Sequence, residues 1–229
     1  MVTPTRAQID IRDAEELDLL VIAPAGCGKT EAMALRVAGL IERGQVRAPR
    51  RVLVTTFTNR ARDNIRERLG SYIRPAMMRD RVSVMNFHGL AARIFRAHAN
   101  VIGLVPELTI PESDWVGDQC RTRKLGFKRS SEVQGLLRRT KQLPLDDAAV
   151  IERLTDAGDS IALEIERKRI AEGRLTYDDL PRLAELILQD DCVADLYRQH
   201  FSWLVSFVLC QLPCCFQRGS GRSLGFPII

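Results

Sequence analysis

Apolar runs rich in β-branched residues alternate with amphipathic stretches along the first part of the chain. The runs with the composition of buried strands are LLVIA at 19–23, RVLVTTF at 51–57 and RVSVMNF at 81–87. Each run precedes a stretch whose apolar residues have helical spacing, and these stretches end near Gly44, Gly70 and Asn100. Successive strand and helix units of this kind predict an α/β fold with a parallel sheet.

The strand pattern disappears from about residue 101 to 175, where the chain becomes polar, has helical spacing and is punctuated by prolines. We expect residues 1–100 to form the first part of the core and residues 101–175 to form an inserted helical subdomain. Residues 176–205 would then return to the core, because FSWLV at 201–205 has the composition of another buried strand.

Charge favours a polyanionic partner only mildly, because the formal net charge is +5. The steepest local bias lies at 121–141, which carries eight basic residues against the single acid Glu132. This stretch is either a solvated helix face or a surface that contacts a phosphate backbone.

The sequence gives no sign of export, a membrane anchor or a metal site. Charged residues throughout the first eighteen positions exclude a secretory signal there, so we expect a cytoplasmic protein. The uncharged span at 201–217 is short for a bilayer crossing, so we expect no membrane partner. The six cysteines lack the spacing of zinc ligands and are interpreted as free thiols.

The segment APAGCGKT at 23–30 has the pattern of a phosphate-binding loop, with alanine in place of the usual first glycine. It follows an apolar run and opens an amphipathic stretch, which is the context that this loop requires. Glycines let backbone N–H groups turn toward phosphate oxygens, and the helix adds its positive N-terminal end. Lys29 would contact the β and γ phosphates, and Thr30 would bind Mg²⁺. The residues expected to hold ATP here are Ala23, Pro24, Ala25, Gly26, Cys27, Gly28, Lys29 and Thr30, with the last two also catalytic.

Four segments make the chain resemble the UvrD/Rep group of superfamily 1 DNA helicases. The first is PTRAQIDIRDAEELDLLVIAPAGCGKT at 4–30, and the resemblance implies that its glutamine, Gln8, reads the adenine edge of ATP. The second, VLVTTFTNRARDNIRERL at 52–69, is similar to the family segment TFTNKAAxEMxxRL, which lies along single-stranded DNA. The DNA contacts implied by this second segment are Thr56, Phe57, Thr58 and Asn59.

The third segment is VSVMNFHGLAARIFRAH at 82–98, which is similar to the family segment TFHSxxxRILR. The resemblance implies that Phe87 and His88 also face DNA. Asn86 and Gly89 stand where threonine and serine are usual, which puts individual hydrogen bonds in doubt but not the placement of the segment.

The fourth segment, RLTYDDLPRLAELIL at 174–188, resembles the family segment containing DFDDLL, which returns the chain from the helical insertion to the first RecA-like domain. Its adjacent carboxylates, Asp178 and Asp179, would suit metal or acid/base chemistry. Their place at the start of a helix instead favours N-terminal capping.

The resemblance implies a P-loop NTPase fold: a RecA-like parallel sheet with a helical insertion, which uses ATP and Mg²⁺ to unwind DNA 3′ to 5′ along a single strand. In the family, the strand matching 201–205 continues into an Asp-Glu pair, the Walker B element. Here residues 206–229 contain no Asp or Glu. We therefore expect an incomplete fold, negligible turnover and an out-of-frame tail over 206–229.

Two other functions fit parts of the sequence. The first is a non-catalytic nucleic-acid-binding remnant that kept the basic stretch. The second, ranked lower, is a P-loop kinase, which would use Lys29 and Thr30 but leaves TFTNRARDNIRERL and FHGLAARIFR unexplained. Hydrolysis of ATP stimulated by single-stranded DNA would separate a motor from a remnant. The sequence does not indicate protein partners.

Overall fold

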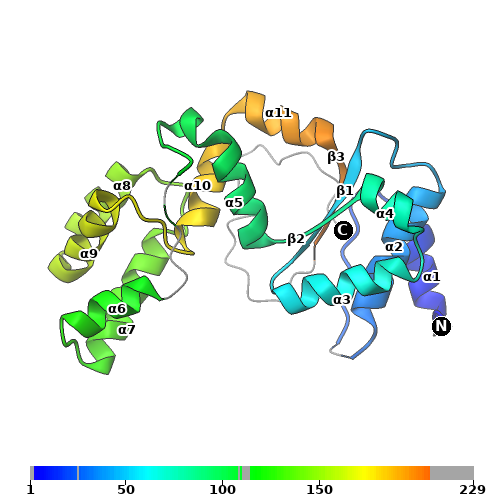
Figure 1. Ribbon diagram of the computed structural model, residues 1–229. Helices are drawn as coiled ribbons and strands as arrows, with labels where there is room; N and C mark the ends of the chain where they lie inside the picture. The colour runs from blue at the N-terminus through cyan, green and yellow to red at the C-terminus, as the bar shows by residue number, and fades with distance from the viewer. Residues whose placement is uncertain (1–2, 25, 108, 110–113, 207–229) are drawn as a thin grey trace. The chain divides into compact units, whose positions relative to one another are not determined.

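The computed structural model describes residues 3–24, 26–107, 109 and 114–206. Its helices are α1 (Arg6–Asp13), α2 (Lys29–Glu42), α3 (Asn59–Gly70), α4 (Pro75–Arg81), α5 (Phe87–His98), the 3₁₀ helix η1 (Ala99–Ile102), α6 (Trp115–Thr122), α7 (Phe127–Thr140), α8 (Asp147–Asp156), α9 (Ser160–Ala171), α10 (Asp179–Ile187) and α11 (Asp191–His200). Its strands are β1 (Arg51–Thr56), β2 (Val82–Asn86) and β3 (Phe201–Ser206) (Figure 1).

The described residues divide into two compact units. The first comprises residues up to Phe87 together with those from Ala194 onward, and the second comprises His88–Val193. The predicted out-of-frame tail lies, apart from Ser206, outside the described residues.

The first unit is built around a parallel sheet of three strands in the order β2, β1, β3 (Figure 1). The register places Val54 of β1 beside Val84 of β2 and Val205 of β3. The central strand β1 is buried over nearly its whole length, which explains why it has a continuous apolar sequence. Three of the four predicted strands are thus confirmed, and so is the α/β class with a parallel sheet.

The fourth predicted strand, at 19–23, is wrong, because this run has no regular secondary structure. Leu20 and Ile22 are 83% and 86% exposed. A strand needs a neighbour for its backbone N–H and C=O groups, and among the described residues the run pairs with neither edge of the sheet. An apolar composition without a pairing partner does not form a strand.

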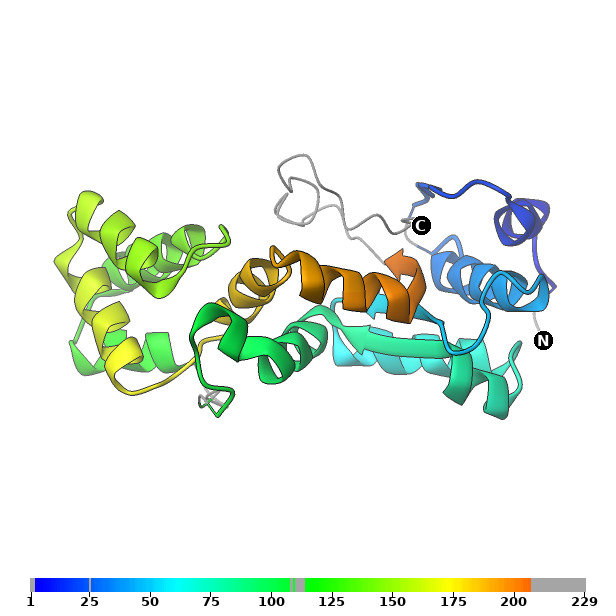
Figure 2. The same ribbon diagram turned by 90° about the horizontal axis from the view of Figure 1, so that it is seen from above.

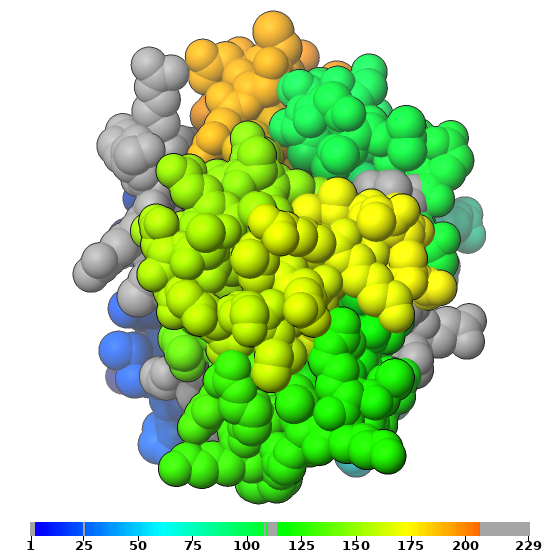
Figure 3. Space-filling model, turned by 90° about the vertical axis from the view of Figure 1, so that its left-hand side faces the viewer, coloured from blue at the N-terminus to red at the C-terminus, as the bar shows by residue number. Residues whose placement is uncertain are grey.

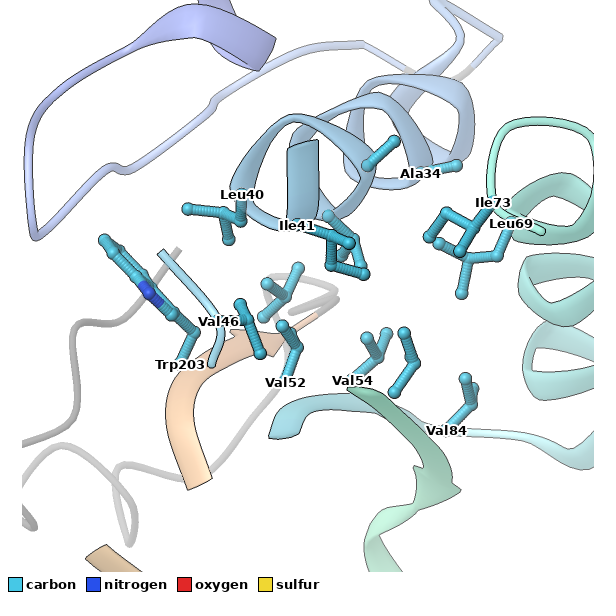
Figure 4. Close-up of a cluster of buried hydrophobic side chains, with 14 of the residues drawn as sticks. Ala34, Leu40, Ile41, Val46, Val52, Val54, Leu69, Ile73, Val84 and Trp203 are labelled. Atoms are coloured by element: carbon cyan, nitrogen blue, oxygen red, sulfur yellow. The ribbon is translucent and has the colours of Figure 1, made fainter. Parts of the chain in front are cut away.

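Helices α2 and α3 cover one face of the sheet and form the core of the first unit with it. Figure 4 shows Leu40 and Ile41 of α2 above Val52 and Val54 of β1, with Trp203 of β3 at one side. Each buried aliphatic side chain of this kind contributes about 1.5–3 kcal/mol. This packing fixes α2, and with it the loop that leads into α2, against the sheet.

The ends of β1 and β2 lie side by side, because Thr56 is in register with Asn86. In a parallel sheet, both strands therefore deliver the residues that follow them to the same edge. The segment beginning at Phe57 and the residue Phe87 leave the sheet from neighbouring positions, which is how the fold brings two separate sequence segments together.

The second unit, His88–Val193, contains helices α6 to α10. Helices α6 to α9 enclose an apolar core that includes Val133, Leu137, Val150, Leu154 and Ile165. These four helices are gathered into one bundle in Figure 2, and Figure 3 shows α8 and α9 (yellow-green and yellow) with the green atoms of the α6–α7 region below them. Among the described residues, every helix falls short of the length and hydrophobicity needed to span a membrane.

Candidate functional site

The loop before α2 has the backbone conformation of an anion-binding turn. Gly26 and Gly28 have φ angles of +83° and +72°, in the left-handed region that favours glycine. A Cβ atom on Gly28 would lie 2.6 Å from the side-chain nitrogen of Gln8, so a larger residue there would displace the Gln8 side chain. Gly28 is also the N-cap of α2 and forms no side-chain cap hydrogen bond within the described structure. The first-turn N–H groups of α2 are therefore left for an anion.

The side chain of Lys29 turns back over this loop. Its Nζ donates hydrogen bonds to the carbonyl oxygens of Ala23, at 2.9 Å, and Pro24, at 2.6 Å. These acceptors are neutral, so the positive charge of the ammonium is not cancelled by them. Thr30, the second residue of α2, is partly buried, and Cys27 is an exposed thiol. The remaining predicted member, Ala25, lies outside the described residues.

Gln8 connects helix α1 to the phosphate-binding loop. Its Oε1 accepts a hydrogen bond from the backbone N–H of Thr5 at 2.9 Å, which completes a capping box at the start of α1. Its Nε2 donates to the carbonyl oxygen of Gly28 at 3.3 Å. Oε1 can accept a second hydrogen bond and Nε2 can donate a second one. A neighbouring donor and acceptor of this kind suit the edge of a base.

An acidic residue that the sequence analysis did not single out lies beside the loop. Glu31, in the first turn of α2, accepts a hydrogen bond from the hydroxyl group of Tyr72 and lies 3.4 Å from Arg68. The hydrogen bond to Glu31, together with burial, raises the pKa of Tyr72 above its usual value. These contacts tie the start of α2 to α3 and partly neutralise the acid next to the anion site.

The predicted DNA-facing residues of the first unit gather at the ends of β1 and β2. The rings of Phe57 and Phe87 meet edge to face with centroids 5.7 Å apart, and Phe57 remains 39% exposed. The side-chain oxygen of Asn59 accepts a hydrogen bond from the amide of Asn86 at 2.8 Å. An exposed aromatic ring flanked by amide groups can stack on a base and hydrogen-bond beside it.

Two of the predicted DNA contacts have local structural roles. Thr56 is fully buried, and its hydroxyl donates to the carbonyl oxygen of Thr58 at 3.3 Å. Thr58 is the N-cap of α3, where its side chain accepts a hydrogen bond from the N–H of Ala61 at 3.1 Å. Both residues hold the turn that presents Phe57, and only Thr58 is itself exposed.

His88, which opens the second unit, contacts a residue of the returning segment. Its ring meets that of Tyr177 edge to face with centroids 5.6 Å apart. Burial lowers the pKa of His88 below its usual value, although the nearby Asp178 opposes this. His88 is therefore a neutral, half-buried ring at neutral pH, whereas Tyr177 is 54% exposed.

Asp178 is the N-cap residue of α10 and Asp179 lies in its first turn, as predicted, but the side chain of Asp178 makes no cap hydrogen bond in the described structure. Its neighbour Asp179 is fully buried and accepts hydrogen bonds from the backbone N–H and the hydroxyl of Thr176, at 2.8 Å and 2.6 Å. The buried carboxylate of Asp179 is also contacted by three cations, Lys141, Arg169 and Arg182, which are the strongest partners for such a group.

Asp179 belongs to a buried ionic cluster that joins α7, α8, α9 and α10. The members of this ionic cluster are Lys141, Asp147, Glu166, Arg169, Asp179 and Arg182, linked by contacts of 2.7–3.6 Å. Burial alone would raise the pKa of Asp179. Attraction by Lys141, Arg169 and Arg182 outweighs burial and holds that pKa below its usual range.

The three acids of the ionic cluster also have the spacing of metal ligands. Their carboxylate oxygens lie within 4.8 Å of one another. However, Lys141 Nζ lies 2.8 Å from Glu166 and 3.0 Å from Asp179, and two guanidinium groups take the remaining oxygens. The protein's own cations therefore occupy the positions that a metal ion would need, and the geometry fits a structural role.

The basic stretch at 121–141 forms the end of α6, the following turn and α7. Lys141 is buried in the ionic cluster, whereas the other basic residues of the stretch are at least partly exposed. Phe127, at the start of α7, is 92% exposed among them. An exposed aromatic ring surrounded by cations is a surface that suits nucleic acid.

Comparison with known proteins agrees with the resemblance found in the sequence. The family model for the UvrD/REP helicase N-terminal domain matches residues 5–205. The chain is 39% identical over 103 residues to the ATP-dependent DNA helicase PcrA of Leuconostoc citreum, a match covering 45% of this chain and 14% of that protein.

Two further relatives match over longer stretches. The ATP-dependent DNA helicase PcrA of Bacillus subtilis is 28% identical over 157 residues, covering 68% of this chain and 19% of that protein. The ATP-dependent DNA helicase UvrD1 of Mycobacterium leprae is 30% identical over 205 residues, covering 80% of this chain and 25% of that protein. The matched part thus spans a quarter or less of the length of each relative.

Proposed function

The chain belongs to the UvrD/REP helicase N-terminal domain family, and on that premise we propose that its first unit binds ATP and single-stranded DNA. The observation that carries the proposal is the turn before α2. There, Gly26 and Gly28 adopt left-handed conformations and the side chain of Lys29 folds over them. Such a turn at the uncapped start of a 14-residue helix suits a phosphate group.

The residues around the turn fit a nucleoside triphosphate with its magnesium ion. Lys29 would exchange its two carbonyl acceptors for charged phosphate oxygens, which are the stronger partners. The hydroxyl of Thr30 would serve as a ligand to Mg²⁺, which neutralises charge on the phosphates. Gln8, whose amide donates to the carbonyl oxygen of Gly28, would meet the adenine edge.

Single-stranded DNA would contact the edge of the sheet where β1 and β2 end. Phe57 offers an exposed ring for stacking, and Phe87 supports it from the neighbouring strand. The amides of Asn59 and Asn86 supply polar groups beside the ring. Substitution of Phe57 by alanine should weaken the binding of an oligothymidylate by about 5- to 100-fold, which fluorescence anisotropy would measure.

Nucleotide binding without appreciable turnover is our expectation for this polypeptide. From Ser206, the last residue of β3, to residue 229 the sequence contains no Asp or Glu, so this stretch supplies no carboxylate pair to hold magnesium or prepare a water molecule. Phosphoryl transfer depends almost wholly on the placement of such charged groups. A steady-state ATPase assay, with and without single-stranded DNA, should therefore give a rate close to the uncatalysed one.

The binding of a fluorescent ATP analogue tests the nucleotide site. Lys29→Ala should weaken binding by about 10- to 100-fold, because it removes a charge-assisted contact to phosphate. Lys128→Ala, an exposed lysine of α7 in the second unit, is the matched control and should leave the affinity unchanged. Equal affinities of Lys29→Ala and the unsubstituted chain would refute the assignment of the loop.

A second candidate is a nucleic-acid-binding module without a motor. The exposed basic residues of α6 and α7 around Phe127 favour it, because they suit a phosphate backbone whether or not ATP binds. ATP hydrolysis that rises when single-stranded DNA is added would exclude this candidate. DNA binding that is indifferent to ATP and to Lys29→Ala would support it.

A further inference from the structure

The second unit contains a cavity that none of the roles above uses. It has a volume of about 280 Å³ and lies between α6, α7 and the segment 176–178 that leads into α10. We propose that this cavity receives one base of single-stranded DNA. The inference deepens the single-strand binding proposed above and depends on it.

The size of the cavity selects a small ligand. Pockets for drug-sized molecules occupy about 300–1,000 Å³, so a cavity of about 280 Å³ lies just below that range. It has room for one planar heterocycle. The sugar and phosphate would remain outside, which is the arrangement of a base on a continuous strand.

The lining of the cavity matches a nucleobase. Trp115 is only 8% exposed and supplies an apolar wall, and Gln134 of α7 carries an amide that can donate to and accept from a base edge. Tyr177, which is 54% exposed, offers a ring at the open side of the cavity. Aromatic and apolar walls with one amide favour stacking together with limited hydrogen bonding.

The charges around the cavity are arranged for a phosphate at the mouth rather than inside. Lys141 also lines the cavity, but its ammonium is only 2% exposed and is paired with Glu166 and Asp179. The side chain of Arg138 is 65% exposed, and its Nε lies 3.9 Å from a carboxylate oxygen of Asp178, beyond hydrogen-bond distance. The guanidinium of Arg138 can therefore meet a phosphate. The lining also holds two acids, Asp178 and Asp114, and Asp114 accepts a hydrogen bond from the N–H of Gly117 at 3.0 Å.

The neighbourhood of the cavity favours DNA over a free nucleotide. Tyr177 contacts His88, which directly follows Phe87, a residue of the single-strand site proposed above. A strand that passes His88 therefore passes the mouth of the cavity. A free nucleotide would gain nothing from this placement.

The test compares an oligothymidylate with an abasic oligonucleotide of the same length and charge, using the full chain and fluorescence anisotropy. Val116→Trp, which fills the cavity from α6, and Tyr177→Leu, which removes the ring, should each weaken oligothymidylate binding by about 5- to 100-fold. Neither variant should change the binding of the abasic strand. Tyr177→Phe should retain the affinity of the unsubstituted chain, because it retains the ring.

The outcomes separate this inference from the function on which it rests. If Phe57→Ala weakens oligothymidylate binding but Val116→Trp and Tyr177→Leu do not, the cavity does not receive a base and the single-strand site of the first unit stands. If free thymidine monophosphate displaces the labelled oligothymidylate as effectively as unlabelled oligothymidylate does, the cavity binds free nucleotides rather than a strand and the inference fails. If the unsubstituted chain binds no oligonucleotide, both proposals fail. Tyr177→Leu changes an exposed side chain, so it tests the inference even if Val116→Trp does not fold.

Discussion

The two units of the chain differ in how many charged side chains they bury and in what those side chains contact. In the first, the one fully buried charged side chain among the described residues is Arg36, which donates to backbone carbonyl oxygens, including that of Glu16 at 3.2 Å, and lies 5.5 Å from the ring of Trp203. In the second, six charged side chains form the ionic cluster that joins four helices. The first unit is therefore held by apolar packing on its sheet, and the second by apolar packing together with a polar centre.

This difference means that the proposed sites of the two units rest on different kinds of support. The apolar core of the first unit fixes α2 and the strand ends, while the phosphate-binding loop and Phe57 stay at the surface. The ionic cluster of the second unit orders the segment before α10, which carries Tyr177. One tryptophan lies in each core, Trp203 in the first unit and Trp115 in the second. Single-tryptophan variants therefore report the unfolding of each unit separately.

The largest effect should come from breaking the ionic cluster. Asp179→Ala leaves buried cations without their central acid and should lower the free energy of unfolding of the second unit by about 3–5 kcal/mol. Urea unfolding followed by the fluorescence of Trp115 measures this value. Asp178→Ala, which removes a half-exposed acid 3.9 Å from Arg138, is the control and should cost less than about 1 kcal/mol. Similar costs for the two variants would show that the ionic cluster does not stabilise the unit.

The next effect tests the apolar core of the first unit. Leu40→Ala opens a cavity between α2 and the sheet and should cost about 2–5 kcal/mol in the unfolding transition reported by Trp203. Leu196→Ala, at a site 54% exposed on α11, should cost far less. A larger effect of Leu40→Ala on the Trp115 transition than on that of Trp203 would contradict the assignment of separate cores.

Acid should destabilise the second unit first. Because the folded pKa of Asp179 is below the unfolded value of about 3.9, its stabilisation is complete above about pH 5 and is lost as the pH falls toward the folded pKa. One such carboxylate contributes about 2 kcal/mol. His88 acts in the same direction: its folded pKa is below about 6.5, so protonation in the unfolded state costs stability as the pH falls below that value.

Acid titration of the two single-tryptophan variants checks this order. The Trp115 signal should change at a higher pH than the Trp203 signal. Among the described residues, the first unit buries no carboxylate to a comparable degree, so it offers acid no equivalent target. Loss of the Trp203 signal first would contradict the comparison between the units.

The smallest effect concerns the turn that presents Phe57. Thr58→Ala removes the N-cap of α3 and should cost about 1 kcal/mol in the Trp203 transition. Thr58→Ser keeps the capping oxygen and should restore most of that stability. If Thr58→Ala weakens DNA binding and Thr58→Ser restores it, the hydroxyl of Thr58 is needed for DNA binding, either directly or through the turn. If the unsubstituted chain and both variants bind DNA equally, the role of Thr58 is limited to capping α3.

Local sequence patterns predicted the central strands and the loop before α2. β1, β2 and β3 have apolar runs that suit a strand and also have neighbours to pair with, so composition and pairing agree. The run at 19–23 has the same composition but no pairing partner in the described structure, and composition cannot show whether a partner exists. Gly26 and Gly28 were predictable because their left-handed backbone requires glycine.

Contacts between distant residues were not predictable in this way. Lys141 and Asp179 are 38 positions apart in the sequence, and nothing in either local pattern indicates that they meet. The local pattern likewise indicated a helix start at Asp178 and Asp179 but not the cations Lys141 and Arg182 that contact Asp179. The edge-to-face contact between His88 and Tyr177 likewise joins residues that are far apart in the sequence, and it forms only when the second unit folds.

Hydrogen exchange of the full chain with and without ATP and Mg²⁺ tests the central claim most directly, because it locates the nucleotide on the chain. We predict that protection rises in peptides covering the phosphate-binding loop and the first turn of α2, and that Lys29→Ala abolishes the rise. Unchanged exchange at the loop, or protection confined to the second unit, would contradict the account.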